Sequence, residues 1–485
     1  MVGMEQQKSR SSNAHAERRN YLSTLLPDIN FGSSTTSDWG TGGSSSLSAR
    51  DNYFGRVNYN YKSKYLAEFV FRYDGSANFP EGKRYGFFPS GSIGWRISEE
   101  DFLREAAPWI SQLKLRASVG QVGNDRVSAF QYMQTYSFAG NYVFGTTNAP
   151  GVRAGTMPNP NITWEVSTKY DVGLDGSFWN GLLGFDLTWF KEDRSNILAA
   201  RNLSIPGTLG FASLPNENIG KATNQGFEIM LNHRNRVGED FSYSISANMS
   251  YAKNKIVYMD ETPGTYEWRD QTGRPIGASL YYKADGIFRT QEELDSYPHH
   301  RSSQVGDIRV VDLNDDGKIN SDDQYRFDFS STPRAVFGLN ASFQYKSWDL
   351  SFSLQGQAGA YNYDDRFSVL GVTDQSNAFV DRATDRWTVD NPNGSMPRAD
   401  AWQPGNTTFF LYDATFVRLK NAELGYSLPS RLISKIGLTN LRVYASGFNL
   451  LTWAKEIKWG DPEISGGSYY YPQQRTISLG VSVKF

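Results

Sequence analysis

The chain has 485 residues, with 28 Tyr, 30 Phe, 12 Trp and 45 Gly, and hydrophobic residues make up 39% of it. Its formal net charge is −2, from 49 basic and 51 acidic residues, so no basic footprint points to a nucleic-acid partner. Cysteine is absent, which excludes a disulfide framework and a thiolate metal site. No run of about 18 apolar residues occurs, which excludes a transmembrane helix, although the weak alternating signal of a transmembrane strand escapes such a search.

Taken in chain order, many segments alternate strictly between apolar and polar residues. In 241–251, for example, Phe241, Tyr243 and Ile245 alternate with serines. The stretches run for about 9–11 residues, the length a tilted strand needs to cross a bilayer. The predicted strands include 1–7 (the tail of one strand), 53–61, 65–73, 113–119, 166–174, 241–251, 335–345, 348–357 and 477–485.

The same alternation is expected of a soluble antiparallel sheet with one solvated face, such as a sandwich or a propeller. Aromatic residues at the strand ends favour a transmembrane barrel, because Tyr and Trp form girdles at the level of the lipid headgroups. The aromatic residues in such positions are Tyr59, Tyr61, Trp164, Trp189, Tyr251, Tyr345 and Trp348.

The connections between the predicted strands alternate between short and long. Short connections fall at 62–63, 98–110, 178–181, 235–239, 346–347 and 428–439. Outer-membrane barrels have short periplasmic turns and long extracellular loops, so the rhythm predicts which segments lie outside. The predicted extracellular loops are 11–49, 75–84, 121–162, 195–221, 254–333, 359–413 and 451–473.

The fold class predicted for 1–485 is therefore all-β, a transmembrane antiparallel β-barrel with about 14 strands. Barrels with a plugged lumen have about 22 strands, so we expect about eight strands and the plug domain to be absent. Residues 1–16 also lack the charged and apolar regions of a signal peptide. We therefore expect the chain to be a fragment.

Several segments together resemble the SusC/RagA family of TonB-dependent outer-membrane transporters of the Bacteroidetes, and the resemblance covers essentially the whole chain. They include LKLRASVGQVGND (113–125), GDIRVVDLNDDGKINSDDQ (306–324), FVRLKNAELGYSLP (416–429), LRVYASGFNLLTW (441–453) and TISLGVSVKF (476–485), beside the stretch 65–103.

The resemblance implies a barrel in outer-membrane lipid that imports a glycan or peptide nutrient. Energy would come from the TonB complex, which acts through an N-terminal region missing here, and a SusD-like lipoprotein would form an extracellular lid. Because the TonB box and plug are absent from the sequence, the chain is not expected to transport alone. A surface glycan-binding β-protein without transport is the alternative. No catalytic constellation is found, so an enzyme is not expected.

One acidic motif matches the 12-residue calcium loop. Calcium prefers six to eight oxygen ligands, and Gly317 would allow the sharp turn that the loop requires. Asp replaces the usual Glu at the last position, and an acidic turn on a solvated loop is the competing interpretation. The predicted Ca²⁺ ligands are Asp312, Asn314, Asp316, the Lys318 carbonyl, Asn320 and Asp323.

Aromatic residues in the predicted outer loops are candidates for stacking on a sugar ring or meeting the lid protein, although outer loops also pack on one another. They are Tyr266, Trp268, Tyr281, Tyr282, Trp402, Tyr469, Tyr470 and Tyr471. The chain ends in Phe485, and an aromatic terminus resembles the signal that the outer-membrane assembly machinery recognises. Phe485 is therefore predicted to act in insertion, with a plain lipid-facing role as the alternative.

Overall fold

The computed structural model describes residues 1–23, 25–201, 211, 213–261, 266–364, 384–399, 405–434, 437–457, 460–464 and 473–485. Fourteen strands form one antiparallel sheet whose edge strands are β1 and β22. The strands are β1 Val2–Arg18, β2 Trp39–Tyr61, β3 Tyr65–Ser76, β4 Tyr85–Arg96, β5 Ile110–Asn124, β8 Glu165–Phe178, β9 Leu183–Ala200, β10 Asn216–Val237, β11 Phe241–Tyr258, β16 Ala335–Tyr345, β17 Trp348–Ala358, β20 Phe416–Ser427, β21 Asn440–Ala454 and β22 Thr476–Lys484. The predicted fold class and the strand count are confirmed.

Smaller elements fill the connections. The strands among them are β6 Tyr136–Phe144, β7 Thr147–Ala154, β12 Leu280–Tyr282, β13 Ala284–Ile287, β14 Ile308–Val310, β15 Gln324–Arg326, β18 Tyr361–Tyr363 and β19 Leu411–Asp413. The helices are α1 Asp101–Ala106, α2 Gln291–Ser296, α4 Ser430–Ile433 and the 3-10 turns η1 Ile29–Phe31, η2 Thr36–Asp38, η3 Ile97–Glu99, η4 Trp179–Gly181, η6 Glu267–Arg269, η7 Ser321–Asp323 and η9 Thr408–Phe410. No helix in the described residues is long and apolar enough to cross a bilayer.

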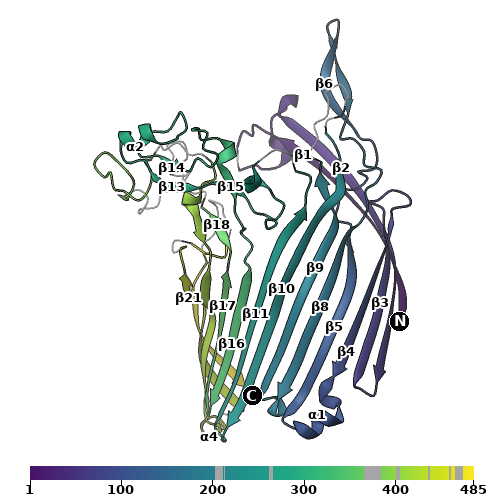
Figure 1. The fold of residues 1–485 in the computed structure, drawn as a ribbon, viewed down its shortest axis with the longest axis vertical. Helices are drawn as coiled ribbons and strands as arrows, with labels where there is room; N and C mark the ends of the chain where they lie inside the picture. Colours follow the sequence, from purple (N-terminus) through teal and green to yellow (C-terminus); the bar gives the residue numbers. More distant parts are fainter. Residues whose placement is uncertain are drawn as a thin grey trace.

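The two ends of the sheet differ. Figure 1 shows α1, α4 and the C-terminus at the lower end, and β6, α2 and β13 to β15 at the upper end. Most connections at the lower end are shorter than those at the upper end, and the exception is 77–84 at the upper end, which is shorter than 97–109 and 428–439 at the lower end. The two-residue turn of Lys346 and Ser347 links β16 to β17, and Lys346 adopts a φ of 52°. That the upper end is extracellular stays a prediction.

Several predicted loops are too long because the flanking strands continue into them, as β9 to Ala200 and β10 from Asn216 do within 195–221. The largest difference is at 11–49. Residues 11–49 were expected to be a loop, but β1 continues to Arg18 and β2 begins at Trp39, with the two strands paired residue by residue. The connection itself is only 19–38. The reason is that the outer halves of these strands are polar on both faces, as the pair Ser9 and Ser48 shows, so no alternation marks them.

Where the strands alternate, one face carries apolar side chains and the other carries polar ones. Apolar residues lie opposite apolar residues of the neighbouring strands: Ile245 lies opposite Ala341, and Ala341 lies opposite Phe352. On β22, Leu479 and Val481 are 85% and 62% exposed. An apolar face left open along a whole sheet is suited to lipid and not to water.

Buried hydrophobic clusters lie at the upper end, and one of them includes Phe88 of β4. Tyr282, Ile308, Val310, Ile319 and Phe410 form another. It joins two long connections, and we call residues 266–330 and 384–413, as far as they are described, the two-loop unit. Asp307 in the first connection is fully buried and accepts a hydrogen bond from Arg398 in the second, at 2.6 Å.

Candidate functional site

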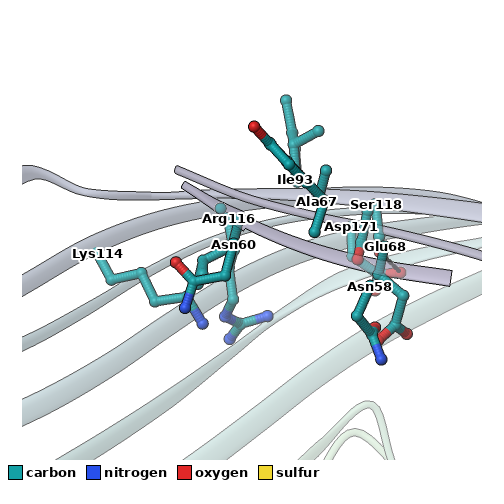
Figure 2. A pocket seen from close by; sticks show the side chains of 14 residues that line it. Asn58, Asn60, Ala67, Glu68, Ile93, Lys114, Arg116, Ser118 and Asp171 are labelled. Carbon is teal, nitrogen blue, oxygen red and sulfur yellow. Dashed lines mark hydrogen bonds between the residues drawn. The ribbon is translucent and has the colours of Figure 1, made fainter. Parts of the chain in front are cut away.

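The polar face of the sheet contains a hollow of about 420 Å³ near the lower end. Its lining residues come from β2, β3, β4, β5 and β8, and alternate side chains of each strand point to the same face. Figure 2 shows Asn58, Glu68 and Arg116 on one side of the strands and Ala67 and Ile93 on the other. The hollow therefore opens on the polar face, which we take as the inner face of a barrel.

Arg116 on β5 organises the charges beside this hollow. Its Nε donates to Asp175 Oδ1 at 3.0 Å, and its Nη2 donates to Asp186 Oδ1 at 2.9 Å and to Thr188 Oγ1 at 2.6 Å. Asp175 and Asp186 lie directly opposite each other on β8 and β9. Like charges in that register destabilise a sheet, and the guanidinium between them removes the repulsion.

A second arginine bridges two carboxylates on β17 and β20, although these carboxylates are not directly opposite each other. Arg442 on β21 donates from Nε to Asp349 Oδ1 at 2.9 Å and from Nη2 to Glu423 Oε1 at 2.6 Å. Each arginine also lies over a glycine of the next strand. A Cβ at Gly173 would be 2.5 Å from Arg116 Cζ, and one at Gly425 would be 2.3 Å from Arg442 Nη2.

The two carboxylates in the hollow accept hydrogen bonds from neighbouring side chains. Glu68 in the hollow accepts from Arg56 Nε at 2.9 Å, and Asp171 accepts from Ser118 at 3.3 Å. Such a surface is wet and rich in hydrogen-bonding groups, but its arginines are already paired with carboxylates. It is suited to neutral or zwitterionic solutes more than to multivalent anions.

The predicted calcium ligands come together in one tight loop of the two-loop unit. Asp312 Oδ2 accepts from Gly317 N at 2.8 Å, and Asp316 Oδ1 accepts from Lys318 N at 2.8 Å. Asp323 is fully buried and accepts from the backbone of Leu313 at 2.9 Å. Burial and the nearby Asp312 carboxylate raise the pKa of Asp323.

The two loop interpretations are both consistent with this geometry. Asn320 Oδ1 accepts from Asp322 N at 2.7 Å, and Asn314 Oδ1 accepts from Asp316 N at 3.2 Å, as expected of an acidic turn. Asp312 Oδ1, however, is buried without a hydrogen-bond partner. No group of three or more His, Cys, Asp or Glu side chains arranged to hold a metal occurs among the described residues. Calcium binding here stays a prediction.

The described aromatic candidates pack within the outer loops. Tyr266 and Trp268 stack on each other with ring centroids 4.4 Å apart. Trp268 Nε1 donates to the Asp322 carbonyl at 2.9 Å, so this pair supports the acidic loop. Tyr282 is only 8% exposed, in the core of the two-loop unit, and burial raises the pKa of Tyr281.

The remaining candidates are at the end of the chain or outside the described residues. Phe485 is 87% exposed, and its carbonyl accepts from Thr439 Oγ1 at 3.2 Å. Trp402, Tyr469, Tyr470 and Tyr471 lie outside the described residues. The inner-face arginines were missed by the sequence analysis. Their only sequence signal is a charge at a polar position of an alternating strand.

Comparisons with known proteins agree with this architecture. A family model described as TonB dependent receptor-like, beta-barrel, matches residues 6–450. TonB-dependent receptor P3 of Formosa agariphila is 32% identical over 463 residues, which cover 89% of this chain and 45% of that protein. TonB-dependent receptor SusC of Bacteroides thetaiotaomicron is 29% identical over 449 residues, which cover 89% of this chain and 43% of that protein. The chain thus spans less than half the length of these two relatives.

A solved structure of the RagAB peptide transporter has a TM-score of 0.79 to this chain at 22% identity. The match covers 100% of this chain and 53% of that chain, and at such identity it shows the fold. The two relatives are TonB-dependent receptors, and the solved structure is that of a peptide transporter. The chain therefore belongs to the TonB-dependent receptor-like β-barrel family of the bacterial outer membrane, with SusC among its relatives.

Proposed function

We propose that the chain forms part of the wall of a TonB-dependent importer that takes up glycan or peptide nutrients across the outer membrane. The observation that carries the proposal is the two-faced sheet. One face is apolar and exposed, as at Leu479, and the other bears the polar hollow beside Arg116. A wall of that kind separates lipid from a water-filled passage.

The solute class is argued from the charges on the inner face. A multivalent anion would have to compete with the carboxylates that already hold Arg116 and Arg442. Glycans and peptides are held instead by many hydrogen bonds of modest strength, which a surface of Asn, Ser and Thr side chains supplies. The likeness to the RagAB peptide transporter supports the peptide class.

Two partners are part of the proposal: a SusD-like lipoprotein lid and the TonB complex. The relatives named SusC and RagAB support them, because these are the family members that the sequence resembles. The two-loop unit and the β6–β7 hairpin rise from the upper end of the sheet, where such a lid would meet the barrel (Figure 1).

Uptake by living cells tests this proposal. Cells carrying or lacking the gene would be given fluorescent peptides and oligosaccharides, with and without a protonophore that removes the energy supply. We expect accumulation inside cells that carry the gene and retain their energy supply. Label that binds to the cell surface equally with and without energy, and never enters, would favour the alternative of a surface glycan-binding protein.

A further inference from the structure

The apolar face of the sheet has a depression of about 710 Å³ over β2, β3, β4, β5 and β8, reaching β9. It lies behind the inner-face hollow, on the other side of the same strands. Figure 2 draws the inner-face hollow, and in it Ala67 and Ile93, which also line the depression, point away from Glu68 and Arg116. The depression therefore opens toward the membrane.

Small residues form the low points of the depression, and the larger Ile93, Val119 and Val172 also line it. Ala67, Gly91 and Ala117 line it from three neighbouring strands. Gly91 lies opposite Phe69 on β3, and Ala117 lies opposite Ile93 on β4. A Cβ at Gly91 would have a single neighbour, the Glu68 carbonyl oxygen at 4.0 Å, so the space above this glycine is open.

Aromatic side chains make the rim. Tyr59, Phe69, Tyr170 and Trp189 border the depression, and all four are exposed on the apolar face. The small residues and the larger aromatic residues around them together form a groove. The alternation of transmembrane strands requires only an apolar surface and does not require a groove. A flexible chain lying in a groove contacts protein atoms on three sides and gains more dispersion energy than on a flat surface.

We propose that this groove binds one acyl chain of a phospholipid of the outer membrane. The occupant follows from continuity with the lipid-facing surface, which family membership places in a bilayer. Tyr59 is three residues from the turn at Lys62, about 10 Å along the strand, so the groove begins close to the lower end of the sheet. This step rests on the proposed orientation, in which the lower end meets the periplasmic leaflet, and that leaflet consists of phospholipid.

Bromine quenching of tryptophan fluorescence tests the site. The protein from its native outer membrane, in detergent micelles, would be titrated with phosphatidylethanolamine carrying dibrominated acyl chains. Subtracting the curve of Trp189→Phe from that of the wild type isolates Trp189, and Trp348→Phe isolates a lipid-facing tryptophan outside the groove. These residues are 47% and 50% exposed, so they are matched in access. We expect half-maximal quenching of Trp189 at about a tenfold lower lipid concentration than that of Trp348.

A second test replaces the small residues of the groove by larger ones. Gly91→Leu should raise the lipid concentration for half-maximal quenching of Trp189 about tenfold, because the leucine occupies the space of the chain. Ala67→Leu fills the same groove from β3, so the test does not depend on one variant folding. Ala445→Leu is the control, since Ala445 is exposed on the apolar face of β21, away from the groove.

Different results would overturn the groove itself and its assignment to phospholipid. Parallel quenching of Trp189 and Trp348, or variants of Gly91 and Ala67 that behave like Ala445→Leu, would overturn the groove as a binding site. Unbrominated phosphatidylethanolamine should relieve the quenching of Trp189. Relief by lipopolysaccharide at lower concentrations than by phosphatidylethanolamine would overturn the assignment to phospholipid. Either result leaves the uptake proposal standing, because that proposal is tested in cells.

Discussion

The guanidinium of Arg116 lies over Gly173, where a Cβ would be only 2.5 Å from Arg116 Cζ. Gly173→Ala should therefore push the guanidinium out from between Asp175 and Asp186 and leave the two carboxylates facing each other. We expect a loss of about 1 kcal/mol in the free energy of unfolding, because the groups are partly exposed. Urea unfolding of the detergent-solubilised protein, followed by intrinsic fluorescence, measures the change.

A matched control exists for this substitution. Gly184→Ala on β9 places a methyl group no closer than 3.7 Å to its neighbours, so it should leave the unfolding midpoint unchanged. In an Arg116→Gln background, Gly173→Ala should cost much less than it does alone. Equal costs in both backgrounds would show that the glycine matters for another reason.

Glu100, in the lower connection between β4 and β5, is predicted to make a pH-dependent contribution to stability. It accepts hydrogen bonds from Tyr65 at 2.7 Å, Trp95 at 3.1 Å and Lys64 at 3.0 Å, and these lower its pKa to about 2. The folded pKa is depressed, so the contribution is complete above the ordinary value of 4.5 and is lost as the pH falls toward 2.

The difference in unfolding free energy between wild type and Glu100→Gln measures this contribution. It should be constant from pH 8 to pH 5 and shrink as the pH approaches 2. Glu105→Gln, an exposed position on α1, serves as the control. A difference that already disappears near neutral pH would contradict the depressed pKa.

The acidic loop should bind one calcium ion and become ordered by it. Asp312 Oδ1 is buried without a hydrogen-bond partner, and burial and the Asp312 carboxylate raise the pKa of Asp323, so a cation bound between these groups would remove an unfavourable interaction. We expect calcium to protect the bond after Lys318 from trypsin, and the double variant Asp312→Asn, Asp316→Asn to lose that protection. Asp295→Asn, on α2 of the same connection, should keep it. Equal protection of the wild type in chelator would leave the acidic turn as the correct interpretation.

Phe485→Ala should lower the amount of inserted barrel several-fold while the uptake rate per inserted molecule stays the same. The ring is 87% exposed and follows the last residue of β22, so its loss removes no packing within the sheet. Heat-modifiable mobility of the outer-membrane fraction measures insertion, and Val483→Ala, on the same strand, controls for lost apolar area. Normal insertion with slower uptake would give Phe485 a role in transport.

The strands that cross the bilayer were predictable because lipid and water impose an alternation of period two. The prediction of 335–345 coincides with β16. The rule lapses where both faces of a strand are polar, and the upper halves of β1 and β2 were therefore mistaken for a loop.

The ion pairs of the inner face could not be predicted from the sequence, for a different reason. Arg116 meets Asp175 and Asp186, which follow it by 59 and 70 residues, on two further strands. Which charges face each other depends on the registers of both strand pairs, and a slip of one residue in either would separate them. A single sequence shows that charges exist on the polar face, but it does not show how they are paired.

The two-loop unit also has a consequence for how this protein can change over time. Its core takes Tyr282 and Ile308 from one connection and Phe410 from another, and Arg398 of the second connection neutralises the buried Asp307 of the first. Replacing one connection alone would leave the buried Asp307 carboxylate without its arginine partner and would expose the core of the two-loop unit. The two connections should therefore be gained, exchanged or lost together during evolution, while the sheet that carries them stays unchanged.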